Sequence, residues 1–449
     1  MYKIILAIRY LIRRRITYLA VFAVALCVFM VVVVMTVMTG LLRDFKIKNH
    51  NWVSDCVVSS SSLVGYPYYE EFMKILEGEI VVEAVSPVIK SYALLTHEGS
   101  DWNEGIEIMG VDPVRHSRAT GFGKTLHYRK DDVSKAFEPA YDANLPGCIP
   151  GIDKVLGRGR DGQYRQFSSV PEYSFVISCF PLTARGALTK AGLGLVNTKT
   201  FHYSDNSHSG LAKVDGSFVY IRFEDAQTLC GMGGAEKRVS AIHIKFKPDV
   251  KLQTGCERIS QLWKEFKANK SGRKQAELLN KVRVESWQGY RRDVIAGVEK
   301  EQMMMTAAFG MIGIIAVFVV FVVFYMIVSH NSKDIGILKS VGVSKGNVLV
   351  LFLDFAFLVG VFGSAIGLLG GWQFLVHINQ VEDWLFEHFK FQLWDRTIFA
   401  IGDIPNQMNS GVLAIIALSA ILACLLGALV PSWQAARLKP VETLQVSRL

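Results

Sequence analysis

The segment SKDIGILKSVGVSKGNVLVLF, residues 332–352, lies between two apolar runs that are each long enough to cross a membrane. Its first half is short, net basic and partly amphipathic, and Gly342 and Gly346 interrupt the helical pattern before the second run begins. Glycine weakens a helix interior because it loses the most backbone freedom on folding. The segment therefore predicts a short helix, a break at these two glycines and a new membrane span.

Four apolar windows reach the roughly 20 residues that a helix needs to cross the hydrocarbon core of a bilayer. They span residues 16–42, 304–328, 348–371 and 411–430. The chain is 51% hydrophobic with a mean hydropathy of +0.28, yet 20% of its residues are charged. The charges lie mostly outside the windows, so we expect a membrane bundle joined to a polar domain. The first window is too long for the core of a cleaved signal peptide and is interpreted as an anchor.

The polar domain occupies residues 43–303, between the first and second spans. Its β-type runs lie at residues 56–59, 80–85, 106–111, 173–178, 218–223 and 241–246. Helix-like stretches lie at residues 68–76, 224–229 and 255–267. Strands mixed with helices indicate an α+β domain. Residues 372–410 form a shorter connection between the third and fourth spans.

Seven cysteines do not form a recognisable disulfide framework. Cys27 and Cys424 fall within the spans. The domain holds an odd number without a C-x-x-C pair: Cys56, Cys148, Cys179, Cys230 and Cys256. One or two disulfides and buried free thiols are both consistent with this pattern.

The charge distribution predicts the orientation. Residues 1–15 carry Lys3 and four arginines, and residues 329–347 and 431–449 each carry three basic residues and one acidic residue. These segments account for the whole formal net charge of +9. Because basic loops translocate poorly, we expect both tails and the 329–347 segment in the cytoplasm and the domain outside. Topology explains the basic excess, so a nucleic-acid partner is not indicated.

No pattern for catalysis, a cofactor or a metal stands out. The string RATGFGKT, residues 118–125, ends like a phosphate-binding loop, but Arg118 stands where the first glycine is required. The string HYSDNSH places His202, Asp205 and His208 at intervals of three. Its Ser, Asn and Asp content favours a turn, in which these side chains would not share one face. The chain itself is therefore predicted to be non-enzymatic.

Three motifs at the membrane borders resemble FtsX-like permeases of ATP-binding-cassette (ABC) systems. KDIGILKSVGVSKGNVLVLFL (333–353) is similar to the family's E-I-G-I-L-R-A-x-G-A-S segment. PSWQAARLKPVETLQ (431–445) is similar to its P-A-x-x-A-A-x-L-x-P-V-E-A-L tail. AIRYLIRRR (7–15) precedes the first span as in that family. The resemblance covers all four spans.

Other stretches resemble the permeases of lipoprotein-releasing (Lol) systems. They are VVVVMTVMTGLL (31–42), IEIMGVDP (106–113), SFVYIRFEDAQTL (217–229), VESWQGYRRDVIAGVEKEQMMM (284–305) and TIFAIGDIPNQMN (397–409). Residues 126–210 match the pattern poorly, so the resemblance assigns no cargo or carrier contact there.

The resemblance implies a MacB-like periplasmic core domain and an inner-membrane permease of the mechanotransmission type. A separate ATPase would bind ATP and Mg²⁺, and a second permease, identical or paralogous, would complete a dimer. The cargo would be lipoproteins, passed to a periplasmic carrier. A MacB-like exporter, an FtsX-like regulator of cell-wall hydrolases and a receptor without an ATPase remain alternatives.

The resemblance also places an ATPase-coupling contact in the 329–347 segment. Its candidate residues are Lys333, Asp334, Ile335, Ile337, Leu338, Lys339, Val341 and Gly342. We expect the aliphatic residues to enter a groove of the ATPase, with Lys333, Asp334 and Lys339 at the rim.

Glycines of the third span form a second candidate feature. Gly360, Gly363, Gly367 and Gly371 are spaced by three, four and four residues, so they lie along one side of a helix. Small residues let helix backbones approach closely in lipid. We therefore expect this row to contact another helix of the permease dimer, the first or second span.

Overall fold

The computed structural model describes residues 15–97, 103–159, 163–188, 196–234, 237–330, 332–391 and 403–438. The chain divides into two compact units. The membrane unit consists of Met1–Arg43, Gly297–Trp394 and Ile404–Leu449, and the domain unit of Asp44–Ala296 and Asp395–Asp403. The basic N-terminal tail and most of the C-terminal tail lie outside the described residues.

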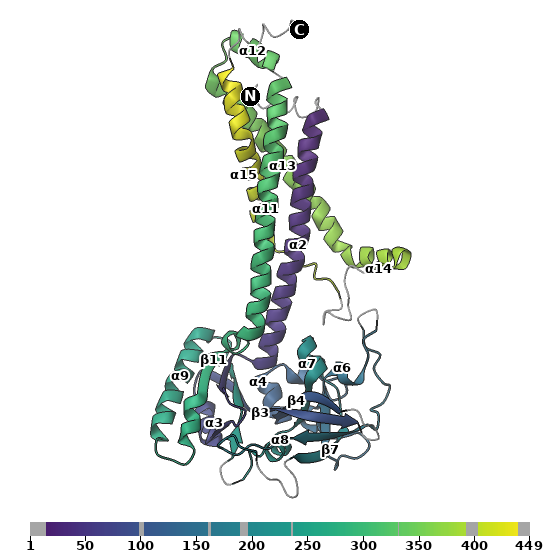
Figure 1. Ribbon diagram of the computed structural model, residues 1–449, viewed down its shortest axis with the longest axis vertical. Coiled ribbons are helices and arrows are strands. Elements are labelled where there is room, and N and C mark those ends of the chain that lie inside the picture. The colour runs from purple at the N-terminus through teal and green to yellow at the C-terminus, as the bar shows by residue number, and fades with distance from the viewer. Residues whose placement is uncertain are drawn as a thin grey trace. The chain divides into compact units, whose positions relative to one another are not determined.

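Within these described ranges, four helices are long and apolar enough to cross a membrane (Figure 1): α2 (Arg15–Val53), α11 (Arg292–His330), α13 (Lys345–Val376) and α15 (Ser410–Arg437). α2 and α11 have 39 residues each, nearly twice the roughly 20 that a span needs. They extend past the predicted borders at residues 42 and 304 because no proline interrupts their polar ends. Hydropathy marks where a helix leaves the lipid, not where the helix ends. α12 (Ser332–Ser340) and α14 (Ile378–Phe389) are shorter.

The domain unit is built on a nine-stranded sheet in the order β11-β1-β10-β3-β4-β8-β5-β7-β6, with a separate pair, β2-β9. β6 also pairs with β3, so β3, β4, β8, β5, β7 and β6 form a closed ring. β3 has 16 residues, and its first part pairs with β10 while its last part pairs with β6. The expected membrane protein with an α+β domain between its first two spans is confirmed.

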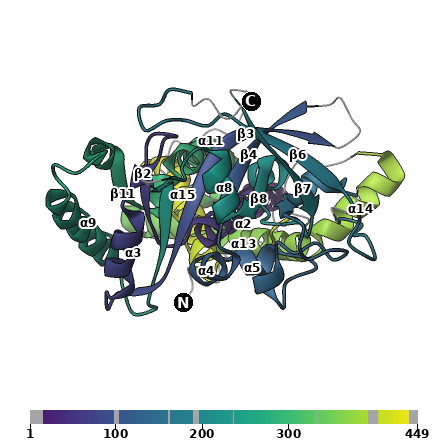
Figure 2. The same ribbon diagram turned by 90° about the horizontal axis from the view of Figure 1, so that it is seen from below.

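The strands are β1 (Cys56–Ser60), β2 (Tyr66–Pro67), β3 (Val82–His97), β4 (Asn103–Val111), β5 (Gly147–Pro150), β6 (Ser174–Cys179), β7 (Asn197–Tyr203), β8 (Phe218–Arg222), β9 (Arg238–Val239), β10 (Ala241–Phe246) and β11 (Val282–Ser286). The helices of the domain unit are α3 (Tyr69–Glu77), α4 (Pro113–Ala119), α5 (Phe122–Thr125), α6 (Ile152–Val155), α7 (Ala212–Ser217), α8 (Phe223–Leu229), α9 (Leu252–Asn269) and α10 (Trp287–Tyr290). Two 3₁₀ turns, Val133–Lys135 and Ala276–Lys281, complete the described elements. Figures 1 and 2 both place α3 and α9 together at the β11 end of the sheet.

Both faces of the sheet are buried. Neighbouring residues of a strand point to opposite sides, so each strand contributes side chains to two cores. In β8, Val219 and Ile221 belong to one apolar core, whereas Phe218 and Tyr220 belong to the other. The first core includes α3 and α9, where the Phe72 and Trp263 rings meet edge to face at 4.8 Å. The second core includes α5, α7 and the end of α2. Two cores on one sheet explain why the domain strands read as nearly continuous apolar runs.

Two histidines are buried in the second face of the sheet. His243 of β10 and His116 of α4 have ring centroids 5.6 Å apart, and both side chains are almost fully buried. Burial, with a smaller effect of Lys90, lowers the pKa of His243 to about 3. Burial, with a smaller effect of His243, also lowers the pKa of His116. Among the described residues, Nδ1 of His243 has no hydrogen-bond partner. Both rings are therefore neutral in the folded protein at neutral pH.

These lowered pKa values predict that acid destabilises the domain unit. Below about pH 6.5 His243 binds a proton in the unfolded chain, whereas in the folded protein it stays neutral until the pH approaches 3. The contribution of His243 to the free energy of unfolding is therefore complete above about pH 6.5 and is lost as the pH falls toward 3. At pH 5 the loss is about 2 kcal/mol. Thermal unfolding of the full-length protein should show a smaller drop between pH 7.5 and 5 for His243→Leu than for wild type. His97→Leu, at an exposed position, should keep the wild-type drop. An unchanged drop in His243→Leu would contradict the argument. Buried Asp205 and Asp215 have raised pKa values, so their protonation in acid stabilises the folded protein and opposes the effect of His243. Comparing His243→Leu with wild type isolates the effect of the histidine, because both proteins keep these aspartates.

Candidate functional site

The predicted coupling segment forms α12 and the turn that follows it. α12 ends at Ser340, and Gly342 adopts a left-handed backbone with φ +96°. This conformation favours glycine because a side chain would clash there. The next helix, α13, begins at Lys345, and the Ser344 side chain accepts a hydrogen bond from the Asn347 amide at 3.3 Å. The break expected at Gly346 is therefore wrong: the serine cap starts the helix first, and Gly346 lies in its first turn.

Lys339 ties α12 to the end of α15. Its ammonium donates hydrogen bonds to the carbonyls of Ala436, at 2.9 Å, and of Leu438. The last carbonyls of a helix have no partner within the helix, so a lysine there satisfies them and complements the helix dipole. Lys339 was expected at the rim of a partner surface. Its ammonium instead binds within the chain, and burial lowers its pKa.

The aliphatic residues of the segment divide between two environments. Ile335 is 2% exposed, whereas Ile337 is 52% exposed and Val341 is 80% exposed. Positions two apart on a helix point in nearly opposite directions, which explains why Ile335 packs inward. Ile335 was expected to enter a partner groove and is instead part of the membrane unit's own packing. The side chains of Lys333, Asp334 and Leu338 lie outside the described part.

An exposed aromatic on α15 was not singled out from the sequence. Trp433 is 49% exposed, and the guanidinium of Arg437 stacks over its ring at 3.6 Å. The Lys339 contacts join this end of α15 to α12. Ile337, Val341 and Trp433 thus supply exposed apolar surface on two connected elements. In the sequence, the place of Trp433 and Arg437 in the P-S-W-Q-A-A-R motif was the signal available for this contact.

The glycines of α13 face two different helices. A Cβ placed at Gly363, Gly367 or Gly371 would lie within 2.6–2.9 Å of α2 atoms. At Gly367 the nearest atom is the Ala25 backbone oxygen, at 2.6 Å. At Gly360 the neighbour is instead α15, with the Ile421 Cα at 3.1 Å. The row therefore contacts two helices, with Gly360 against α15 and the other three glycines against α2. α13 thus lies between the first and fourth spans of its own chain.

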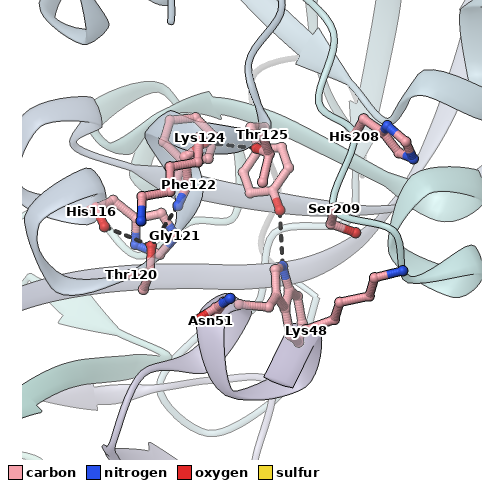
Figure 3. A pocket seen from close by; sticks show the side chains of 12 residues that line it. Lys48, Asn51, His116, Thr120, Gly121, Phe122, Lys124, Thr125, His208 and Ser209 are labelled. Carbon is pink, nitrogen blue, oxygen red and sulfur yellow. Dashed lines mark hydrogen bonds between the residues drawn. The ribbon is translucent and has the colours of Figure 1, made fainter. Parts of the chain in front are cut away.

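A cavity of about 200 Å³ lies in the domain unit beside the end of α2 (Figure 3). Trp52 Nε1 donates to the Tyr220 hydroxyl at 2.9 Å across it, and the Gly121 amide donates to the Asn51 carbonyl at 2.7 Å. The string 118–125 thus packs on the α2 backbone instead of cradling a phosphate. Ligand pockets usually have roughly 300–1,000 Å³, so this cavity is too small for a lipid chain.

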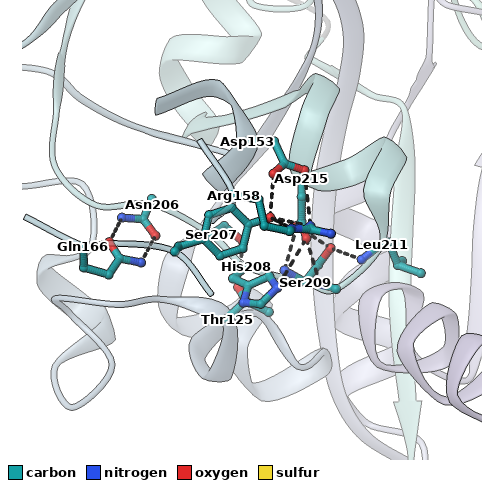
Figure 4. A network of polar contacts seen from close by, with 12 residues as sticks. Thr125, Asp153, Arg158, Gln166, Asn206, Ser207, His208, Ser209, Leu211 and Asp215 are labelled. Carbon is teal, nitrogen blue, oxygen red and sulfur yellow. Dashed lines mark hydrogen bonds and ion pairs between the residues drawn. The ribbon is translucent and has the colours of Figure 1, made fainter. Parts of the chain in front are cut away.

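Residues of the HYSDNSH string take part in a polar network (Figure 4). Buried Asp205 accepts hydrogen bonds from backbone amides, including that of Arg129 at 2.8 Å. His208 lies 3.9 Å from buried Asp215, and His202 pairs with the Tyr141 hydroxyl at 2.7 Å. The three side chains spaced by three residues therefore point to different partners. Within the part of the chain that the structure describes, no group of three metal-ligating side chains converges.

The close approach at Gly367 predicts that even one methyl group disturbs the bundle. Gly→Ala normally favours a helix interior by about 1 kcal/mol. At Gly367 the added Cβ would collide with the Ala25 backbone, so Gly367→Ala should lower the melting temperature and the yield of folded protein. Gly370→Ala is the control on the same helix, because its Cβ would meet only Phe29 at an ordinary 3.6 Å. Equal stability of the two variants would show that α2 does not approach at Gly367.

Comparisons with known proteins place these features in a family. Residues 306–440 match the FtsX-like permease C-terminal family. The chain is 23% identical over 436 residues to the lipoprotein-releasing system transmembrane protein LolC of Neisseria meningitidis serogroup B, covering 96% of this chain and 94% of that protein. The LolC protein of Xylella fastidiosa strain 9a5c is 21% identical, with 95% and 92% covered.

Solved structures of extracytoplasmic regions also align with part of the chain. The periplasmic region of MacB from Actinobacillus actinomycetemcomitans is 10% identical with a TM-score of 0.30, covering 54% of this chain and 94% of that one. The extracellular domain of the ABC-type transporter YknZ from Gram-positive bacteria is 10% identical with a TM-score of 0.28, covering 52% and 97%. The family match and the four spans together decide the assignment. The chain is a membrane-spanning permease subunit of the ABC type, with an FtsX-like permease domain over residues 306–440.

Proposed function

We propose that the chain extracts lipoproteins from the bacterial inner membrane and passes them to a periplasmic carrier. The observation that carries this proposal is the alignment over more than nine-tenths of both chains with proteins named for lipoprotein release. It includes the domain unit as well as the spans, whereas the FtsX-like match covers the spans after the domain unit. Identity of 21–23% supports the shared cargo class without naming the cargo.

The proposed energy source is a separate ATPase that binds ATP and Mg²⁺. It would contact the exposed Ile337 and Val341 side chains on the α12 segment, an apolar surface with no obvious use in solvent. A push on α12 would reach α15 through the Lys339 hydrogen bonds and α13 through the short turn at Gly342. A second permease, identical or paralogous, would place a matching surface under the other half of an ATPase pair.

The path to the domain unit would run through two helices. α2 and α11 each begin in one unit and end in the other without a break in the helix. A helix transmits displacement along its axis because every turn is hydrogen-bonded to the next. Movement of the membrane unit would therefore change the conformation of the domain unit, from which the lipoprotein would be transferred to the carrier.

The proposed orientation places α12 and both tails in the cytoplasm and the domain unit in the periplasm. It predicts that an impermeant thiol reagent modifies Gly157→Cys but not Lys345→Cys in intact cells. Both positions are exposed in the structure, so a difference reports the membrane barrier and not burial. Lysed cells are the control, where both variants should react. Labelling of Lys345→Cys alone in intact cells would reverse the topology.

The coupling surface predicts a selective defect in Ile337→Glu. A carboxylate would be placed in a contact that should be dry, which costs on the order of a few kcal/mol. The variant should insert and fold but lose co-purifying ATPase and ATP-dependent lipoprotein release from proteoliposomes. Ile80→Glu makes the same change at an 82% exposed position of the domain unit and should retain the ATPase.

Two outcomes would redirect the proposal. Retained ATPase binding and release in Ile337→Glu would remove α12 as the docking element. Wild-type complex that hydrolyses ATP without releasing lipoprotein would favour the alternatives, an exporter or a regulator of cell-wall hydrolases. In that case the material that co-purifies with the domain unit would distinguish the two.

A further inference from the structure

Four of the five domain cysteines lie in two contacting pairs. The side chain of Cys56 lies next to that of Cys256, and the side chain of Cys179 lies next to that of Cys230. Cys148 is fully buried outside both pairs. The odd number of domain cysteines is thereby resolved into two pairs and one remaining thiol.

The first pair is held by fixed backbone on both sides. Cys56 begins β1, and the side chain of its neighbour Asp55 accepts a hydrogen bond from the Phe246 amide at 2.8 Å. Gly255, next to Cys256 in α9, packs on the Phe246 ring, since a Cβ there would lie 2.6 Å from it. The start of α9 and the start of β1 therefore meet over one residue, Phe246. Their thiols face each other as a result of this packing.

The second pair is held in the same way. Cys179 ends β6, and three residues later the Leu182 amide donates to the Cys230 carbonyl at 3.3 Å. A Cβ at Gly231 would lie 2.9 Å from Pro181 Cβ, so the two segments are in direct contact. Both thiols are buried, at 0% and 3% exposure.

We propose that Cys56–Cys256 and Cys179–Cys230 are disulfide bonds in the mature protein and that Cys148 stays a free thiol. The inference rests on the proposed periplasmic location of the domain unit, because disulfides persist in the bacterial periplasm. A disulfide requires sulfurs that face each other over a short Cβ separation. The thiols of each pair already lie side by side, and the backbone contacts around them hold the two segments together.

The oxidation is a thiol–disulfide exchange with a disulfide-bonded oxidoreductase. One thiolate attacks the partner disulfide, forms a mixed disulfide and releases one thiolate of the oxidoreductase. The second cysteine then attacks the mixed disulfide and releases the other. Two thiols lose two electrons and two protons, and the oxidoreductase ends as a dithiol. In the first pair Cys256 is the half-exposed member, and its hydrogen bond from Cys56 lowers its pKa, so Cys256 is suited to attack first.

Counting thiols in the full-length protein tests the assignment. Cells are quenched in acid, and the denatured protein is tagged with a maleimide polymer before and after reduction. Of the seven cysteines, three should react before reduction (Cys27, Cys148 and Cys424) and all seven after it. Seven tags before reduction would overturn the inference.

Single serine substitutions give opposite shifts that identify the pairs. Cys256→Ser or Cys230→Ser should raise the count before reduction by one tag, because each frees a partner. Cys27→Ser or Cys148→Ser should lower it by one tag. A lower count in Cys256→Ser or Cys230→Ser would mean that its assigned partner is not bonded to it.

Peptide mapping of the wild-type protein without reduction keeps the test independent of variant folding. It should recover a Cys56–Cys256 peptide and a Cys179–Cys230 peptide, each two hydrogens lighter than the sum of its parts. Any other pairing contradicts the proposal. The labelling of Gly157→Cys separates this result from the topology. Free thiols in a domain that labels from outside refute the disulfides and leave the proposed function intact.

Discussion

The membrane unit depends on close approach of helix backbones, because lipid removes the hydrophobic force that packs helices in water. α13 has glycine where α2 and α15 come nearest, so backbone meets backbone without an intervening side chain. The same device recurs at Gly427, where a Cβ on α15 would lie 2.6 Å from the Val317 oxygen of α11. Short-range dispersion then replaces apolar transfer as the main source of cohesion. The position of α13 in turn fixes where the α12 turn emerges.

The α12 segment joins two kinds of interaction with different purposes. Ile335 and Lys339 bind it to its own chain, through burial and through the last carbonyls of α15. Ile337 and Val341 remain outside. A segment that transmits force needs exposed residues to bind the partner and other residues that attach it to its own chain. Without that attachment, the helix would move and the rest of the chain would not follow. This division supports a transmitting role and explains why the residues of one motif cannot all face a partner.

The sequence predicted the architecture better than the individual contacts. The run 241–246 coincides with β10, and the run at 56–59 lies within β1, because most residues of both runs are apolar or β-branched. β3 was expected to end near residue 85 but continues through Pro87 to His97, because its partners β10, β4 and β6 hold it. β5, β7 and β11 were missed, since their pairing depends on strands distant in the chain. The inward turn of Ile335 and the second face at Gly360 depend likewise on α15, which no local pattern reveals.

The closed ring of six strands also bears on how the domain avoids association with other copies of itself while it folds. A strand with unpaired amides recruits other chains, and closure removes such strands. Among the described residues, the nine-stranded sheet keeps β11 as its free terminal strand, and that strand is only five residues long. It also carries Arg283 and Glu285, charges that disfavour edge-to-edge association. On the proposed orientation the domain folds after translocation, and its own topology would then protect it from self-association with other copies of the chain.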